Sequence, residues 1–170
     1  MKNADDLIVE LNKSTELLIR EISLFKESNF NIKPHPDQWS AGDIAEHIVV
    51  LESFINKVLT GTCVPANRNP EEKILIVKNI FSDFDKKFNA PKPVAPSENL
   101  KSIALLSDEI KASRVVTEEI VIANDLTLIC KDFVHRGFGE MTRTEWIHFC
   151  IYHTERHLYQ MQKIKEKIIR

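Results

Sequence analysis

Residues 142–168 read TRTEWIHFCIYHTERHLYQMQKIKEKI, and this stretch predicts one long amphipathic helix. Thr142 and Glu145 have the spacing of a capping box, in which each side chain accepts a hydrogen bond from the backbone N–H of the other residue. Apolar side chains at helical spacing then predict the inward face: Trp146, Phe149, Cys150, Met161, Ile164 and Ile168. His153 and His157 are one turn apart and fall on that face. The stretch therefore predicts two imidazoles that point into the protein near its core.

Two further long helices are predicted in the first third of the chain. Residues 5–27 carry apolar side chains at three-, four- and seven-residue steps, namely Leu7, Leu11, Leu18, Ile22 and Phe25. Residues 31–36 (NIKPHP) predict a loop, because each proline removes a backbone donor and restricts the residue before it. Ser40 and Asp43 then resemble a second capping box, and Gly61 predicts where that helix ends. Its predicted inner face carries Ile44, Ile48, Leu51, Ile55 and Val58.

Prolines interrupt the middle of the chain. Pro70 follows an asparagine and precedes two glutamates, which is typical of a helix start, and this helix is predicted to run to about Phe88. The proline-rich residues 90–96 end it. Ser97 then predicts the start of another long helix, which lasts into the 120s. The valine-rich residues 115–122 leave a strand open as an alternative there.

Together these stretches predict an all-α protein. Four long helices, with a connection of almost forty residues between the second and the third, predict a four-helix bundle with a long crossover that carries an extra short helix. Residues 124–141 are expected to form an irregular connection. With 4 glycines and few alternating apolar runs, an all-β fold is disfavoured. The length of 170 residues suits a single domain that spans residues 1–170.

The charge balance and the cysteines limit the class of partner and the compartment. With 23 basic and 25 acidic side chains the formal charge is -2, which predicts no binding of nucleic acid or of an acidic membrane surface. The sequence has no run of 18 apolar residues, so no membrane span is predicted. The 3 cysteines are widely spaced, which favours reduced thiols in a cytoplasmic protein over a disulfide framework. We therefore expect a cytoplasmic protein whose partner is a small molecule.

The histidines are the strongest candidates for a functional site. If His47 projects from the second long helix toward His153 and His157, three imidazole nitrogens converge and leave part of a metal ion's coordination sphere open. The alternative is that all three are core histidines, each hydrogen-bonded to a carbonyl or hydroxyl group. Asp43, one turn before His47, is a candidate to accept its second ring proton or to reach the metal through water, although helix capping explains it as well. Gln160 lies on the face of His153 and is a candidate for contact with a ligand or with a water beside the metal.

Other polar residues of the last helix have simpler interpretations. Cys150 is expected to pack in the core rather than to bind metal. His148 points to a different side of the helix from His153, and His135 falls in the irregular connection. Glu155 and Arg156 are expected to form an exposed ion pair. None of these residues is predicted to belong to the metal site.

Three segments of the chain resemble the DinB-like superfamily: residues 39–48 (WSAGDIAEHI), 138–146 (FGEMTRTEW) and 153–160 (HTERHLYQ). The single histidine on the second helix of that family matches His47, and its His-x-x-x-His pair on the fourth helix matches His153 and His157. The resemblance implies a four-helix bundle with a long connection between the second and third helices. It also implies one divalent metal ion, frequently nickel or zinc, and often a homodimer.

The resemblance also implies two kinds of chemistry. YfiT-like members are often named metal-dependent hydrolases, and better understood relatives are thiol-dependent transferases or isomerases that use bacillithiol or mycothiol. Our leading hypothesis is an enzyme in which a metal ion on His47, His153 and His157 activates a low-molecular-weight thiol or water for attack on a small electrophilic substrate. The rival hypothesis is a non-catalytic metal-binding protein, stress-associated or acting as a dimeric interaction module, because a bundle fold alone does not define a function.

Overall fold

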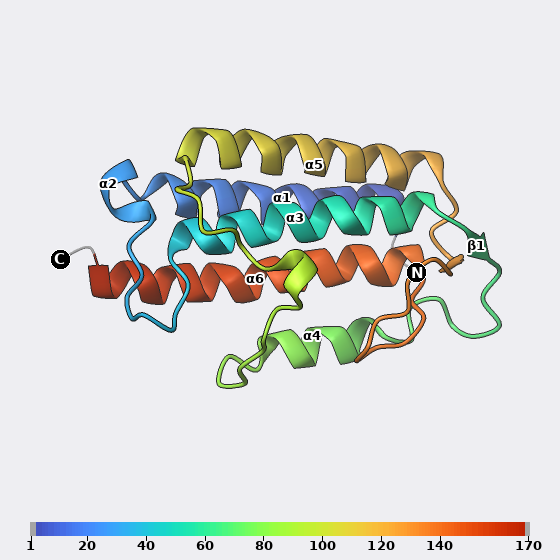
Figure 1. The fold of residues 1–170 in the computed structure, drawn as a ribbon. Helices are drawn as coiled ribbons and strands as arrows, with labels where there is room; N and C mark the ends of the chain where they lie inside the picture. Colours follow the sequence, from blue (N-terminus) through green and yellow to red (C-terminus); the bar gives the residue numbers. More distant parts are fainter. Residues whose placement is uncertain (1–2, 169–170) are drawn as a thin grey trace.

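Four long helices form a bundle in the computed structural model, which describes residues 3–168 (Figure 1). They are α1 (Ala4–Ser23), α3 (Ala41–Thr60), α5 (Ile103–Ala123) and α6 (Arg143–Ile168). Helices α1 and α3 each pack against both α5 and α6, so that the four helices close around a shared interior. The predicted all-α four-helix bundle is confirmed.

A long crossover joins α3 to α5, as the sequence predicted. It contains the short strand β1 (Cys63–Val64), helix α4 (Ile74–Ser82) and the 3-10 turn η1 (Lys92–Val94). Helix α4 packs against α6 and lies outside the bundle, below α6 in Figure 1. The remaining elements are the four-residue helix α2 (Glu27–Phe30) and strand β2 (Ile129–Cys130), which pairs antiparallel with β1. No pattern in the sequence predicts this strand pair.

The predicted capping boxes are present at the starts of α3 and α6. The backbone N–H of Ser40 donates to Asp43 Oδ2 at 3.0 Å, and that of Asp43 donates to Ser40 Oγ at 3.0 Å. At the start of α6 the backbone N–H of Thr142 donates to Glu145 Oε2 at 2.9 Å. Gly61 follows the last residue of α3. Because these signals involve residues only three apart, they could be read without knowledge of the fold.

Two predicted helix boundaries in the crossover were wrong. The helix expected from Pro70 to about Phe88 is only Ile74–Ser82. Its start is delayed because the backbone N–H of Lys73 donates to the buried carboxylate of Glu145 on α6, at 2.9 Å. Its end comes early because the side chain of Arg156, also on α6, donates to the carbonyl of Asp83 at 2.7 Å.

The start of α5 also differs from the prediction, at Ile103 rather than near Ser97. Ser97 instead binds the carboxylate of Glu46 on α3 through its backbone N–H at 2.6 Å and its hydroxyl at 2.8 Å. The backbone N–H of Ile103 donates to the carboxylate of Glu27 at 2.9 Å. Partners distant in the sequence therefore determine where this helix begins. Residues 115–122 are helical, so the strand alternative was wrong.

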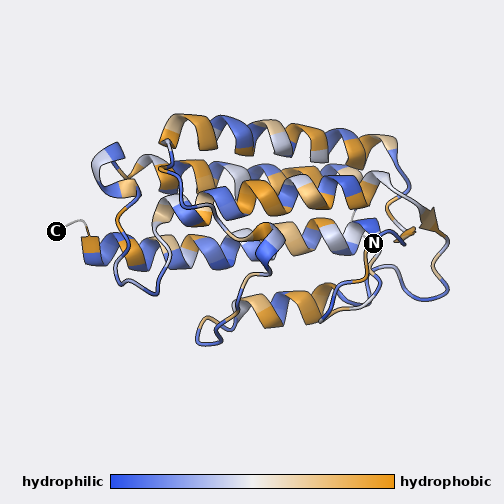
Figure 2. Cartoon of the chain, viewed as in Figure 1, coloured by the Kyte–Doolittle hydropathy of each residue, from blue (hydrophilic) through white to orange (hydrophobic). Residues whose placement is uncertain are grey.

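The interior consists of two apolar clusters with a polar layer between them. One cluster includes Leu11, Leu59 and Trp146, and the other includes Leu18, Ile44 and Met161. Between the two, each long helix places a buried polar residue in the interior, and these are Ser14, Glu52, Arg114 and Thr154. Each long helix accordingly carries both hydrophobic and hydrophilic residues along its length (Figure 2). Among the helices between residues 3 and 168, none combines the length and the apolar character that a membrane span requires.

Candidate metal centre

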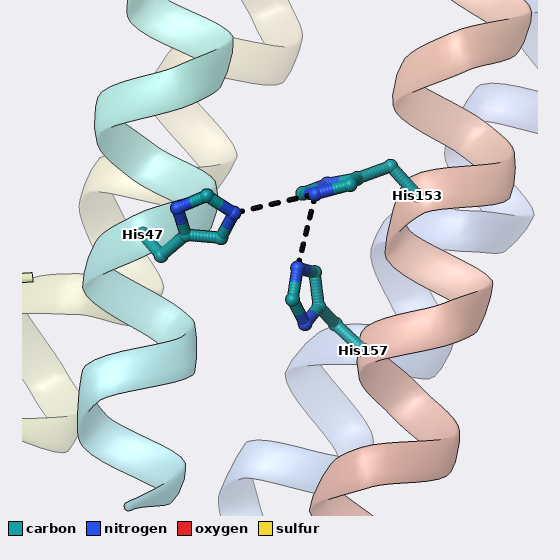
Figure 3. A group of neighbouring side chains, drawn as sticks. All are labelled: His47, His153 and His157. Carbon is teal, nitrogen blue, oxygen red and sulfur yellow. Dashed lines mark hydrogen bonds between the residues drawn. The ribbon is translucent and has the colours of Figure 1, made fainter. Parts of the chain in front are cut away.

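His47 on α3 and the pair His153 and His157 on α6 point toward one another across the bundle (Figure 3). His47 Nε2 lies 3.3 Å from His153 Nε2, and His157 Nε2 lies 3.0 Å from the same atom. All three residues are buried, with exposed fractions of 4%, 8% and 5%. One nitrogen from each ring lies within 4.8 Å of the others, so the structure brings together the three residues that the sequence singled out.

Hydrogen bonds outside the cluster orient two of the three rings. His47 Nδ1 lies 2.6 Å from the carbonyl oxygen of Val94, which can only accept a hydrogen bond. His157 Nδ1 donates in the same way to Gln160 Oε1 at 2.7 Å. In the neutral form of each ring the proton is therefore on Nδ1, and Nε2 presents a bare lone pair to the cluster. Such outer hydrogen bonds are typical of histidines that bind metal.

Burial keeps the three imidazoles neutral. It lowers the pKa of His47, although the carbonyl of Val94 acts in the opposite direction. Burial also lowers the pKa of His157 to about 3, with a further contribution from His47. The pKa of His153 lies well below its ordinary value because of burial and because two other imidazoles are beside it. Neutral rings do not have to lose a proton before they bind a cation.

The three inward imidazole nitrogens fit the binding of a divalent metal ion better than they fit a cluster held by hydrogen bonds alone. His153 Nε2 carries at most one proton, so it can donate to only one of the two bare Nε2 atoms that face it. Metal–nitrogen bonds of about 2.0–2.1 Å separate two ligand nitrogens by about 3.3 Å at a tetrahedral angle and about 2.9 Å at a right angle. The separations of 3.3 and 3.0 Å match this range. No carboxylate or thiol belongs to this group among residues 3–168.

Aromatic rings surround the cluster. Phe149 stacks on His153 with ring centres 5.6 Å apart, and Phe81 meets the same ring edge-on at 5.3 Å. The half-buried Trp39 lies 4.9 Å from the ring of His47 and 6.4 Å from that of His157. Trp39 therefore lies beside the histidine cluster on the side of His47 and His157. These rings exclude water and provide an apolar lining for anything that approaches the histidines.

Residues 83–96 pass from α4 toward α5 and pack against α3 through η1 (Figure 1). We call them the covering segment, because Val94 near their end contacts His47 of the histidine cluster. Arg156 holds the first part of this segment through its hydrogen bonds to the carbonyls of Asp83 and Lys86. Its guanidinium also lies 4.6 Å from the ring centre of Phe88. Arg156 is 5% exposed, so the expected exposed ion pair with Glu155 was wrong. Nothing in the sequence near Arg156 indicated these partners, because they lie about seventy residues away.

The other candidate residues have the following positions. Asp43 participates in the capping box and lies 3.3 Å from Lys101 Nζ, and the acceptor for His47 Nδ1 is Val94 rather than Asp43. Gln160 contacts His157 directly. The remaining residues lie outside the cluster, as expected: Cys150 is buried in an apolar cluster, His148 bonds to the carbonyl of Thr144, and His135 lies at a bridge with Gly139.

Comparison with known proteins agrees with this architecture. Residues 10–161 match the model of the DinB superfamily, and the chain belongs to that superfamily. An uncharacterized protein of Bacillus subtilis (strain 168), YuaE, is 30% identical over 155 residues, which cover 88% of this chain and 91% of YuaE. A solved structure of YfiT from Bacillus subtilis has a TM-score of 0.53 at 16% identity, over 96% of this chain and 86% of YfiT. YfiT is described as a probable metal-dependent hydrolase with an unusual four-helix bundle topology, and at this identity the likeness concerns the fold.

Proposed function

We propose that His47, His153 and His157 bind one divalent metal ion, with zinc or nickel as the first candidates, and that the protein is a metal-dependent enzyme acting on a small electrophilic substrate. The observation that carries the proposal is the convergence of three neutral imidazoles, two of which are oriented by Val94 and Gln160. The description of YfiT as a probable metal-dependent hydrolase supports the same class of activity.

A divalent ion held by His47, His153 and His157 would lower the pKa of water or of a thiol bound to it, and so would supply a nucleophile near neutral pH. The protein's own residues supply the surroundings. Trp39, Phe81 and Phe149 exclude bulk water from the histidines. Arg156 holds the first part of the covering segment, and the carbonyl of Val94 near its end accepts the hydrogen bond of His47. This apolar lining favours a small, uncharged electrophile over a highly charged substrate.

Metal analysis tests the first half of the proposal. The protein is purified without chelators or metal-affinity resin, and its metal content is measured by elemental analysis before and after addition of zinc or nickel. We expect one ion per chain, and none in the His153→Ala variant. The matched control is His35→Ala, which removes an exposed imidazole outside the cluster and should keep the ion. Circular dichroism establishes that each variant is folded. If folded wild-type protein takes up neither metal, the proposed site is wrong.

Activity assays with the loaded protein test the second half. A nitrophenyl ester reports attack by water, and a chloronitrobenzene with added low-molecular-weight thiol reports thiol transfer. We expect turnover in one of the two assays that depends on the metal and is absent in His153→Ala. One bound ion without turnover on a broad panel of electrophiles would instead favour the non-catalytic alternative. The homodimer stays a prediction, which sedimentation of the loaded protein checks.

A further inference from the structure

Cys63 and Cys130 face each other across the strand pair at the end of the bundle where α3 ends and α6 begins (Figure 1). They are 67 positions apart in the sequence, and their sulfur atoms lie 3.8 Å apart. Their wide spacing in the sequence predicts reduced thiols and gives no sign that they meet. Only the pairing of β1 with β2 brings them into contact.

The hydrogen bonds of the strand pair define the geometry of this contact. The neighbouring pair is hydrogen-bonded, because Lys131 N–H donates to the carbonyl of Thr62 at 2.9 Å. The N–H of Cys130 points the other way and donates to the carbonyl of Met141 at 3.0 Å. Cys63 and Cys130 therefore occupy a non-hydrogen-bonded position, where paired Cα atoms of antiparallel strands lie about 4.5 Å apart. That distance falls within the range of about 4.4–6.8 Å that a disulfide spans.

The two thiols differ in access to solvent. Cys63 is half-buried, whereas Cys130 is fully buried beneath it with an exposed fraction of 0%. Burial and the neighbouring Cys63 thiol raise the pKa of Cys130 to about 12. An oxidant therefore reaches Cys63 first, and Cys130 is the thiol held in place to react second.

We propose that Cys63 and Cys130 form a redox-active dithiol site whose co-reactant is a low-molecular-weight disulfide. The Cys63 thiolate attacks one sulfur of the small disulfide, forms a mixed disulfide and releases one small thiol. Cys130 then loses its proton, attacks the Cys63 sulfur and closes the internal disulfide, and the second small thiolate that leaves takes up a proton; because the pKa of Cys130 is raised, this is the slow step. Two electrons pass from the cysteines to the small disulfide, and the two cysteine protons end on the released thiols. The site is independent of the histidine cluster and of the proposed metal.

The disulfide would join the end of α3 to the strand that precedes α6. These are the helices that carry His47 and the pair His153 and His157. A crosslink between distant positions removes freedom from the unfolded chain. We therefore expect oxidation to raise the midpoint of thermal unfolding, Tm, by about 5–10 °C.

Thiol counting tests the proposal on the full chain. Reduced protein is incubated for hours with glutathione disulfide, denatured, labelled with a maleimide and weighed by mass spectrometry. The chain has 3 cysteines, so reduced protein takes up three labels. We expect oxidised protein to take up one label, at the buried Cys150, to lack two hydrogen atoms, and to yield a peptide that links Cys63 to Cys130. The rise in Tm should accompany the loss of the two labels.

Three variants make the result specific. Cys63→Ser and Cys130→Ala should each abolish the internal disulfide and the rise in Tm. If one of these variants does not fold, the other still tests the proposal. Cys150→Ala is the matched control and should keep both. Three labels after oxidation would overturn the proposal, as would glutathione retained on Cys63 or a crosslink between two chains. Metal content of Cys63→Ser should equal that of the wild type, so failure here is distinguishable from failure of the metal site.

Discussion

Two polar groups are buried in the middle of this bundle, and they are built in opposite ways. The arginine network pairs opposite charges, since Arg114 Nε donates to Glu52 Oε2 at 2.7 Å and Nη2 donates to Thr154 Oγ1 at 2.7 Å. The histidine cluster places three like groups together, with lone pairs facing inward. The two groups are direct neighbours, because Thr154 follows His153.

The difference separates a structural polar group from a candidate functional one. In the arginine network each charge finds its countercharge within the protein, as buried charges require. In the histidine cluster Nδ1 of His47 and of His157 has a protein partner, but the inward nitrogens have only one another. A buried polar group whose charges are paired within the protein contributes to the fold. One that needs a cation to complete it indicates a binding site.

The largest expected effect concerns the arginine network. Glu52→Gln removes the negative charge and leaves Arg114 buried without a countercharge, and loss of one partner of a buried ion pair costs about 3–5 kcal/mol. Urea unfolding should show this decrease in the free energy of unfolding, while the folded fraction still takes up metal. The double variant Glu52→Leu with Arg114→Met should recover much of the loss. If Glu52→Gln lowers the free energy of unfolding by less than about 1 kcal/mol, the arginine network does not stabilise the fold in the way proposed.

The second effect concerns the histidine cluster and appears only with metal. Zinc or nickel at about one hundred times its dissociation constant should stabilise the wild type by about 2.7 kcal/mol, because it binds the folded state. His153→Gln should lose this stabilisation. With chelator present, the difference in the free energy of unfolding between wild type and variant should be the same whether or not metal was added first. Equal metal stabilisation in the two proteins would show that the metal binds elsewhere.

A smaller effect tests the outer hydrogen bond of the cluster. Gln160→Ala removes the acceptor of His157 Nδ1–H, and loss of such a partner weakens metal binding by about tenfold or more. The matched control is Gln162→Ala, which removes an exposed amide two residues further along the same helix. Competition with a metal-binding dye measures both affinities. If the two variants bind equally well, Gln160 does not orient the ring.

The smallest effect concerns a histidine outside both groups. Burial lowers the pKa of His135, which packs against Phe138 and Trp146. As the pH falls below about 6.5, the unfolded chain takes up a proton at this residue before the folded chain does, so stability is lost. The effect should stay below about 1 kcal/mol, since solvent partly screens the ring. Urea unfolding at pH 7.5 and 5.5 should show a smaller decrease for His135→Asn than for the wild type; an equal decrease would assign it to other groups.

Local signals explain which parts of the fold were predictable. The capping boxes at Ser40 and Thr142 marked the starts of α3 and α6 correctly, because their partners are three residues away. The predicted start of α5 was wrong, because the observed start depends on contacts with Glu27 and Glu46 from other helices. Short strands with no alternating pattern gave no signal before their pairing was known.

In the candidate site, too, the sequence predicted the local geometry but not the contacts between distant segments. The spacing of His153 and His157 alone determined that both lie on one face of α6, since the helix repeat sets that geometry. Their approach to His47, the hydrogen bond from His47 to Val94, and the position of Arg156 under the covering segment were decided only by the packed structure. Periodicity and caps act over one or two turns, whereas contacts between α3, α6 and the crossover depend on how whole helices pack. The sequence alone therefore determined that four long helices form and which faces they bury, and tertiary packing decided some of their ends and the partners of those faces.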